Sequence, residues 1–450
     1  MSDRLPGPDA PPLAWHEWLA LGLYGLVTRL LSLRVRARAR RRALQEPLYG
    51  HALDERLGVY DPPAEQVPGG WVWVHAVSLG ETRAAALLVQ ALRQRWPGMR
   101  LLLTHSTATG WAQGQSLLQP GDRQTWLPWD SAQAVRRFLR HFRPRLGLLL
   151  ETEVWPVLLH ECRRAGVPMA LVNARLSEKS WRQAQRLGAL SRPAYAALGC
   201  VLAQHADDAA RLRSLGATQV QVVGNLKFDV QVGEAAQSLA VQWAPAWPAG
   251  RPRVLLASTR EGEEALWLQA LEALQPLLRP LHILWLLVPR HPQRFDAVAA
   301  EVLAAGLTLS RRSQWSATPD LSQVDVVLGD SMGEMQAWAL SGQLALLGGS
   351  FAPLGGQNLI ELLAAGCPVV MGPHTFNFAD AAQQARQAGV AFEAADMQQA
   401  LACVAQILQN PAERDGAARR TGPWLADQRG AVERHVQALT AWGGAPPGTG

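Results

Sequence analysis

Short apolar runs of strand length alternate with helical patterns through most of the chain, and this alternation constrains the fold more than any other feature. In the first half the runs lie at residues 71–77, 101–104, 146–150, 169–173, 201–204 and 221–224. In the second half they lie at 254–258, 283–288, 324–328, 344–347 and 369–371. Strands that are apolar at nearly every position are typical of a parallel sheet covered on both faces. The pattern therefore predicts an α/β protein with two doubly wound, Rossmann-like parallel sheets.

The alternation is interrupted once, at residues 231–252, where prolines and a glycine gather. At 450 residues the chain is long enough for two domains, each with its own core. The predicted organisation, in order, is a membrane-associating helix with a basic flank (1–45), a first domain (46–232), a linker (233–252), a second domain (253–443) and a disordered tail (444–450). Ligands of such sheets bind at the carboxyl ends of the strands, so we expect a binding cleft between the two sheets.

The N-terminal segment predicts contact with a membrane. Residues 18–33 are largely apolar, and arginines follow at positions 34, 36, 38, 40, 41 and 42. The uninterrupted run, 18–28, is shorter than the roughly 20 residues that span a bilayer, and the charges follow it, unlike those of a signal peptide. We expect an interfacial helix or a marginal span, held by arginines at anionic lipid on the cytoplasmic side. A core-packing helix with a solvated basic end is the alternative.

Composition narrows the class of ligand. The formal net charge of +6 favours an acidic partner. The four cysteines are far apart in sequence with no CxxC pair, which favours a reducing compartment and argues against a zinc site. No HxH or HExxH spacing occurs, and no DxD pair follows a strand, so we expect no metal.

The only lysines are Lys179 and Lys227, and a lysine retained among arginines suits a compact point charge on a phosphate.

A glycine-rich segment at residues 348–378 is a candidate phosphate site. A short strand runs into Gly348, and a second glycine pair, Gly355 and Gly356, precedes a helix that begins at Asn358. Asparagine is a good N-cap, and Glu361 stands where a capping-box acid belongs. The N–H groups and dipole of such a helix suit a phosphate. An ordinary βαβ unit with glycine turns explains the segment equally well.

Acids follow two strands of the first half. Glu81, in His75-Ala-Val-Ser-Leu-Gly-Glu81, opens a helix, where it could act as a general base or simply complement the helix dipole. Glu151 and Glu153 end an apolar strand before Pro156, where they could face an active site or cap the next helix.

Three loops of the second half also follow strands. Residues 258–264 (STREGEE) and 288–292 (VPRHP) bring cations to strand ends, and 329–335 (GDSMGEM) brings Glu334, which could accept a hydrogen bond from a ribose or a base. No single loop is specific, but together they indicate one site.

Nine motifs in order resemble the family of 3-deoxy-D-manno-oct-2-ulosonic acid (Kdo) transferases, which start the inner core of lipopolysaccharide. They are HAVSLGE, LLLETEVWP, LVNARLSEKS, VVGNLKFD, STREGEE, LLVPRHPQRF, LGDSMGEM, GGQNLIE and MGPHTFNF. The resemblance covers residues 71–380. It implies a GT-B fold, CMP-Kdo as donor, a lipid A precursor (lipid IVA) as acceptor, and inversion at the sugar carbon. It also implies no cofactor, no nucleic-acid partner, and a location on the cytoplasmic face of the bacterial inner membrane.

The resemblance assigns roles to residues. Glu81 matches the family's base, and Glu151 and Lys227 match two supporting positions. The implied CMP contacts are Pro289, Arg290, Gly333, Glu334, Met335, Asn358, Leu359, Ile360 and Glu361. Further candidates in the cleft are Ser78, Arg175, Arg260 and His374.

The chain departs from the family pattern at Gln357 and Arg260, where histidine is usual, and at Leu359-Ile360, where the family has Pro-Leu. Two alternatives remain: a GT-B transferase that uses a UDP-sugar, and a non-catalytic membrane-bound nucleotide-binding protein. The number of Kdo residues added, the oligomeric state and whether the N-terminal helix spans the membrane stay open.

Overall fold

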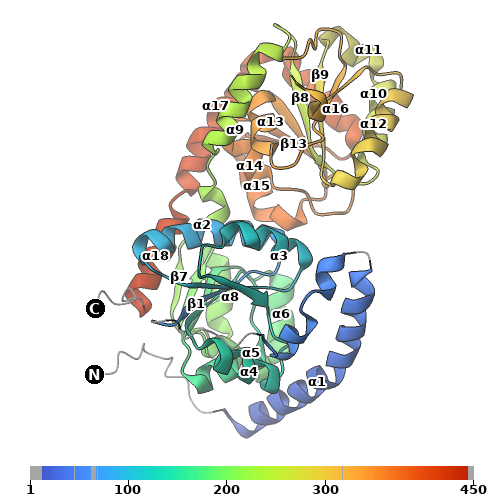
Figure 1. Ribbon diagram of the computed structural model, residues 1–450. Coiled ribbons are helices and arrows are strands. Elements are labelled where there is room, and N and C mark those ends of the chain that lie inside the picture. The colour runs from blue at the N-terminus through green and yellow to red at the C-terminus, as the bar shows by residue number, and fades with distance from the viewer. Residues whose placement is uncertain (1–12, 45, 62–66, 68, 317, 444–450) are drawn as a thin grey trace. The chain divides into compact units, whose positions relative to one another are not determined.

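The computed structural model describes residues 13–443 except 45, 62–66, 68 and 317, and its internal contacts divide the chain into two compact units (Figure 1). The first unit comprises the chain up to Asp229 together with the segment from Arg429 onward. The second unit is the continuous segment Val230–Gln428. The predicted tail, 444–450, and the first twelve residues of the predicted N-terminal segment lie outside the described residues.

The first unit is built on a seven-stranded parallel sheet with the order β3-β2-β1-β4-β5-β6-β7. Its strands are β1 Trp71–His75, β2 Leu101–His105, β3 Arg123–Trp126, β4 Pro144–Leu150, β5 Met169–Ala174, β6 Cys200–Ala203 and β7 Val220–Val222. The chain leaves β1 toward one side of the sheet and returns at β4 toward the other, so the order reverses between these two neighbours. That reversal is where open α/β sheets bind ligands.

Helices cover both faces of this sheet. They are α1 Trp15–Ala43, α2 Leu79–Arg95, α3 Ala108–Gly114, α4 Ala132–Phe142, α5 Pro156–Ala165, α6 Glu178–Arg186, α7 Gly188–Ala196, α8 Ala206–Ser214 and α18 Ala431–Gly443, with short 3-10 turns η1 Pro47–Gly50, η2 Leu53–Leu57, η3 Gln115–Leu117 and η4 Leu226–Asp229. One core joins the sheet to α4, α5, α7 and α8 around Phe138 and Leu158. The other joins it to α2 and α18 around Leu88 and Leu439. Burial on both faces explains why the strand sequences are continuously apolar.

The second unit repeats this architecture with the order β10-β11-β9-β8-β12-β13-β14. Its strands are β8 Arg253–Thr259, β9 Leu284–Pro289, β10 Leu309–Arg311, β11 Val326–Leu328, β12 Leu344–Leu347, β13 Val369–Met371 and β14 Ala391–Glu393. Its helices are α9 Glu234–Trp243, α10 Glu263–Ala273, α11 Gln275–Leu278, α12 Phe295–Ala304, α13 Met335–Ser341, α14 Leu359–Ala364, α15 Ala379–Gln387, α16 Met397–Gln409 and α17 Pro411–Gln428, with 3-10 turns η5 Ala244–Ala246, η6 Arg279–Leu281, η7 Pro292–Arg294, η8 Arg312–Gln314 and η9 Phe376–Phe378. The predicted α/β class with two parallel sheets is confirmed.

Two segments differ from the predicted organisation. The stretch predicted as a linker, 233–252, contains α9 and η5, and Trp243 at the end of α9 is buried against Trp338, with ring centroids 4.5 Å apart. Helix α18, expected in the second domain, groups with the first unit because its apolar face packs on α2 and β6, where Leu439 is fully buried.

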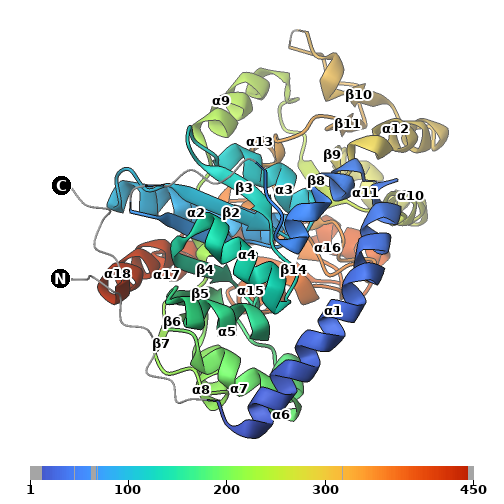
Figure 2. The same cartoon turned by 60° about the horizontal axis from the view of Figure 1, so that its bottom comes forward.

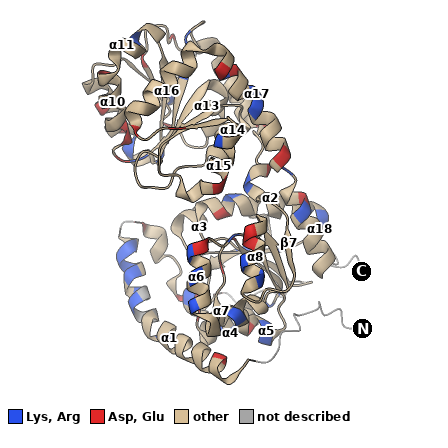
Figure 3. Cartoon of the chain, turned by 180° about the vertical axis from the view of Figure 1, so that it is seen from behind, with Lys and Arg blue, Asp and Glu red and all other residues tan. Residues whose placement is uncertain are grey.

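Helix α1 extends the predicted apolar segment at both ends. Among the described residues it is the one helix long and apolar enough to cross a membrane, by length and composition alone. In the structure it contacts α7, α5 and η1 of the first unit (Figure 2). Its arginines gather in its C-terminal half (Figure 3).

Candidate functional site

The switch point of the first sheet brings two predicted acids to the same edge. Glu81 stands in the first turn of α2, directly after β1, and Glu151 directly follows β4. Since β1 and β4 are parallel neighbours, the chain segments that follow them leave the sheet at the same edge. The two carboxylates therefore face one region of the first unit.

Glu81 is held by the start of its own helix. Ser78 is the N-cap of α2, and its Oγ accepts a hydrogen bond from the Glu81 backbone N–H at 3.4 Å. The carboxylate Oε2 of Glu81 in turn accepts from the backbone N–H groups of Val77 at 2.5 Å and Ser78 at 2.9 Å. This capping box fixes the side chain through one oxygen. Within the described part of the chain, the other oxygen, Oε1, receives no hydrogen bond.

The electrostatic setting of Glu81 is unusual for a surface acid. Burial and, second to it, the negative charge of Glu151 raise the pKa of Glu81 to about 7, against the opposing effect of the backbone N–H of Ser78. A carboxyl group with a pKa near 7 exchanges a proton readily at neutral pH. The geometry and the pKa of Glu81 thus permit the predicted general-base role.

Glu151 lies at the centre of a charge cluster. Its side chain is 5% exposed and its backbone has a φ of 54°, in the left-handed region. The Nζ of Lys227 lies 2.7 Å from Oε1 of Glu151, and the Nε of Arg175 lies 3.3 Å from Oε2. The structure therefore brings together three residues that the sequence predicted separately, from the end of β4, the end of β5 and η4.

The turn that carries Lys227 is anchored by α18. Asp229, two residues after Lys227, accepts hydrogen bonds from the backbone N–H groups of Gly430 at 2.7 Å and Val432 at 2.5 Å, at the start of α18. Phe228, between them, is buried. In the L-K-F-D motif, Lys227 thus supplies a cation to Glu151, Phe228 anchors the turn in the core, and Asp229 caps α18.

A second tie runs through Asn173 on β5. Its backbone N–H donates to Nε2 of His435 on α18 at 3.0 Å, and its Oδ1 accepts from the backbone N–H of Leu226 at 3.0 Å. His435 is fully buried, and burial lowers its pKa to about 4, so it accepts as a neutral imidazole. Sequence reasoning missed Asn173, Asp229 and His435. Asn173 and Asp229 carried a signal, since each lies inside a recognised motif, and His435 carried none.

Glu153, the second acid after β4, turns to other partners. Its Oε2 accepts from the indole N–H of Trp155 at 2.8 Å and lies 3.6 Å from Nε2 of His75. His75 is fully buried at the end of β1, and its Nδ1 lies 2.9 Å from Oγ1 of Thr104. This pair supports the edge of the sheet behind Glu81.

The second unit gathers the predicted donor residues at the carboxyl edge of its own sheet. Pro289 ends β9, and the backbone N–H of Arg290 donates to the carbonyl of Thr259 on β8 at 2.9 Å. Gly333 has a φ of 84°, which lets the loop after β11 turn into α13 at Met335. Glu334 accepts from Nη2 of Arg312 at 3.0 Å and from the hydroxyl of Ser331.

Asn358 is the N-cap of α14, as the sequence predicts. Its Oδ1 accepts from the backbone N–H of Ile360 at 3.1 Å. The side chains of Leu359 and Ile360 are fully buried, so these two predicted contacts can reach a ligand only through their backbone. Glu361 lies in the first turn. The backbone N–H of His374 donates to the carbonyl of Ser350 at 3.0 Å, which ties the loop after β13 to the loop after β12.

Two buried acids hold these loops, and sequence reasoning gave them no role. Glu263 accepts from the backbone N–H groups of Gly349 at 2.7 Å, Phe351 at 3.1 Å and Arg260 at 2.8 Å. Glu264 pairs with both terminal nitrogens of Arg294, at 3.0 and 2.7 Å. The acids of the STREGEE motif thus hold the glycine-rich loop after β12 in place. The side chain of Arg260 lies 3.3 Å from that of Glu261.

No group of three or more His, Cys, Asp or Glu side chains within the described ranges is arranged to hold a metal ion. All four cysteines are free thiols.

Comparison with known proteins agrees with this architecture. The sequence model of a family described as 3-deoxy-D-manno-octulosonic-acid transferase (kdotransferase) matches residues 51–230. The chain is 49% identical to the 3-deoxy-D-manno-octulosonic acid transferase of Bordetella pertussis, over 94% of this chain and 99% of that protein. It is 31% identical to the enzyme of that name from Haemophilus influenzae, over 88% of this chain and 92% of that protein.

Among solved structures, the fold is similar to that of the UDP-GlcNAc 2-epimerase from Neisseria meningitidis bound to UDP-GlcNAc. The TM-score is 0.55 at 16% identity, and the match covers 82% of this chain and 99% of that one. At this identity the likeness shows the fold alone, which is of the GT-B type.

Proposed function

Because the chain belongs to the 3-deoxy-D-manno-octulosonic acid (Kdo) transferase family, we propose that it transfers Kdo from CMP-Kdo to a lipid A precursor, lipid IVA, with inversion at the sugar carbon. The observation that carries the proposal furthest is the setting of Glu81. It combines a capped, fixed carboxylate, an oxygen without a protein partner among the described residues, and a pKa near 7.

Glu81 is the proposed general base. Its Oε1 takes the proton from the acceptor hydroxyl while the hydroxyl oxygen forms a bond to the ketosidic carbon of Kdo. The bond between that carbon and the phosphate oxygen of CMP breaks, and its electron pair leaves with the phosphate. A single base and attack from the face opposite the phosphate give inversion.

Glu151 and its cations are proposed to tune this base. The charge of Glu151 is one of the causes that raise the pKa of Glu81, and a higher pKa makes a stronger proton acceptor. Lys227 and Arg175 lie against Glu151 and hold its side chain in place. In this arrangement Lys227 acts within the first unit, as a partner of Glu151.

The second unit is the proposed donor-binding domain, and the first the acceptor-binding domain. Arg290 and the backbone N–H groups that begin α14 are suited to the leaving phosphate, because charge develops there as the bond breaks. Glu334 and the turn at Gly333 are suited to the nucleoside. Transfer then requires residues from both units.

The proposed location is the cytoplasmic face of the bacterial inner membrane, through α1. Its length, its apolar composition and the arginines in its C-terminal half support contact with anionic lipid. No cofactor is required in this scheme, since CMP-Kdo is a substrate.

One incubation tests the proposal. The purified full-length protein is mixed with CMP-Kdo and lipid IVA, and the products are separated and read by mass spectrometry. We expect product one or more Kdo units heavier than the acceptor, together with free CMP. A parallel reaction with UDP-GlcNAc is the control, and transfer of that sugar alone would overturn the donor assignment.

A further inference from the structure

A groove runs between α1, α4 and α5 in the first unit, and none of the residues assigned to the reaction is among those that line it. Its volume is about 700 Å³, within the roughly 300–1,000 Å³ of pockets that hold drug-sized ligands. Each helix contributes residues spaced three, four and seven apart, such as Gln133, Arg136 and Arg140 on α4. Residues at that spacing share one face of a helix, so the groove follows the helix axes.

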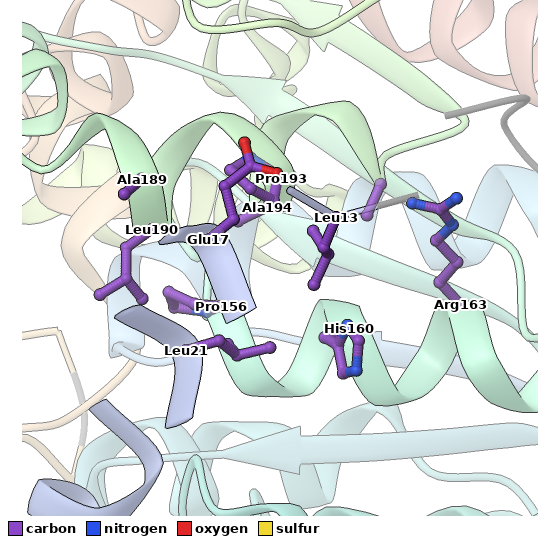
Figure 4. A pocket seen from close by; sticks show the side chains of 11 residues that line it. Leu13, Glu17, Leu21, Pro156, His160, Arg163, Ala189, Leu190, Pro193 and Ala194 are labelled. Carbon is purple, nitrogen blue, oxygen red and sulfur yellow. The ribbon is translucent and has the colours of Figure 1, made fainter. Parts of the chain in front are cut away.

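Helix α1 is fixed to the first unit along this groove. Near its start, Leu13 and Leu21 approach Pro156 and Leu190 around a small cavity of about 20 Å³ (Figure 4). Trp18 packs edge-on against His160, with ring centroids 5.2 Å apart.

Polar contacts fix the rest of the helix. The hydroxyl of Tyr24 bonds to the buried carboxylate of Asp130, and Thr28 Oγ1 donates to the backbone carbonyl of Asp130 at 3.0 Å. Farther on, Arg36 pairs with Asp54 at 2.8 Å. These contacts, together with those of Trp18, span five turns of α1 and hold it lengthwise on the unit.

The two walls of the groove differ in chemistry. The α1 wall is apolar, with Trp18, Leu21 and Leu26 beside two glycines. The opposite wall carries Arg136, Arg140 and Arg164, and α1 adds Arg29 at one end. One acid, the buried Glu161, pairs with Arg136 at 2.8 Å and lies 3.8 Å from Arg164. Four arginines thus face one carboxylate, and the groove is amphipathic with a positive side.

The glycines of α1 leave its wall open. A Cβ atom added at Gly22 or at Gly25 would meet no atom within 4 Å. Glycine inside a helix costs roughly 1 kcal/mol relative to alanine, so the local preference of the helix does not explain these residues. Their effect is to leave space along this wall of the groove at two neighbouring positions.

The outward face of α1 is apolar and exposed. Trp15, Leu19, Leu23 and Leu30 are 75%, 64%, 64% and 66% exposed. Apolar patches of this kind, rimmed by cations, mark contact with a membrane. The groove opens beside this face, since Trp18 and Leu26 line the groove and are themselves more than half exposed.

We propose that the groove binds one anionic phospholipid of the bilayer, and that α1 therefore lies in the plane of the membrane. The phosphate pairs with Arg140 and Arg164, because guanidinium groups bind phosphate through paired hydrogen bonds. Arg136, whose Nε and Nη2 bond to Glu161, adds positive charge beside them. An acyl chain follows Gly22 and Gly25. Crossing the bilayer would instead strip α1 of its contacts with Asp130 and Asp54. The inference deepens the membrane part of the proposed function and does not depend on the donor.

Two variants test the site, each with a matched control. Gly25→Leu adds bulk to the groove wall where a Cβ meets no atom within 4 Å, and Ala37→Leu creates the same side chain at an exposed position of α1 outside the groove. Arg140→Gln removes one cation whose described contact is a hydrogen bond to the carbonyl of Arg136, and Arg95→Gln on α2 is its control. Thermal unfolding first confirms that each variant folds. If Gly25→Leu fails to fold, Arg140→Gln carries the test.

Binding is measured by co-sedimentation with phosphatidylcholine vesicles, with and without phosphatidylglycerol, and native mass spectrometry records retained lipid. We expect one retained phosphatidylglycerol per chain, lost in Gly25→Leu. Affinity for anionic vesicles should fall about tenfold in Gly25→Leu, since each buried methylene carries roughly fourfold. It should fall about fivefold in Arg140→Gln, at the scale of one arginine near an anionic surface. Both controls should match the parent.

Two outcomes overturn the proposal. The first is vesicle binding in Gly25→Leu and Arg140→Gln equal to that of their controls. The second is unchanged vesicle binding with a raised KM for lipid IVA, which would identify the acceptor as the occupant. Activity on a short-chain soluble acceptor separates this test from the reaction itself. That activity should persist in all four variants, and its absence in the parent protein would count against the transfer reaction and leave the lipid result standing.

Discussion

Both units place glutamates at the carboxyl edge of a parallel sheet, and these glutamates have different partners. In the second unit, Glu263 accepts three backbone N–H groups and Glu264 is paired with Arg294 and Thr259. In the first unit, Glu81 uses one oxygen to cap its helix and keeps the other without a partner in the described structure.

The difference lies in how completely each carboxylate is satisfied. A buried acid whose oxygens are all engaged stabilises a loop and has no capacity for a substrate. An acid with one fixed oxygen and one available oxygen is oriented but still reactive. The motifs HAVSLGE and STREGEE both place acids directly after a strand. Only their hydrogen-bond partners distinguish an acid that can react from an acid that stabilises a loop.

The largest expected effect is on the available acid. Glu81→Gln should lower turnover about 100-fold or more, the usual scale for a positioned base. Glutamine at this position keeps the capping box, so the fold should be retained. Turnover is measured by CMP release, and thermal unfolding monitors the fold. Near-native turnover in the folded variant would remove Glu81 from the mechanism.

The same substitution in the second unit should show the opposite pattern. Glu264→Gln keeps the shape of the side chain but removes the charge that faces Arg294, whose side chain is 14% exposed. We expect a loss of about 1–3 kcal/mol in the free energy of unfolding, the scale of hydrogen bonds to charged groups. Turnover per folded molecule should stay close to the parent value. Chemical denaturation and turnover together decide whether Glu264 serves stability and Glu81 serves the reaction.

A pH profile sharpens the comparison further. The pKa of Glu81 is raised to about 7, so the carboxylate that accepts a proton is present above that value and lost below it. The ratio kcat/KM, which reports the free enzyme, should therefore fall up to tenfold for each pH unit below about 7, and level off above it. The residual activity of Glu81→Gln should lack this dependence. An unchanged profile in that variant would assign the titration to another group.

The smallest expected effect is that of chelation. The proposed scheme stabilises a single leaving phosphate with Arg290 and backbone N–H groups, so it contains no step that needs a metal. Turnover in excess EDTA should stay within experimental error of the untreated rate. If EDTA abolished turnover and magnesium restored it, a metal ion rather than protein groups would stabilise the charge of the leaving phosphate.

The central strands of both sheets could be predicted from sequence because burial on two faces leaves an unmistakable apolar run. The strands missed were β3, β10 and β14, and all three lie at sheet edges. Their sequences, RQTW, LSR and AFE, are short and partly polar because one side faces solvent or a loop. Helix α9 was missed because the prolines after it suggested a break through the whole segment.

For the candidate site, the positions of the acidic residues at the sheet edge could be predicted from the sequence, but their hydrogen-bond and ion-pair partners could not. The strand-end rule brought Glu81 and Glu151 to one edge, and the motifs drew attention to Lys227. The contact of Asn173 with His435 joins residues 262 positions apart, and no local pattern signals such a pair. Catalytic and CMP-contact roles stay predictions until the variants are measured.

The return of α18 to the first unit has a consequence for the order of assembly. The second unit is one continuous segment and can fold as soon as residue 428 has been synthesised. The first unit starts earlier but lacks the caps on Asp229 and the imidazole on Asn173 until α18 arrives. The second unit therefore contains all of its own segments before the first unit does, and the turn that carries Lys227 gains its support last. A chain truncated after Gln428 would keep every segment of the second unit and lack the support of the cluster around Glu151.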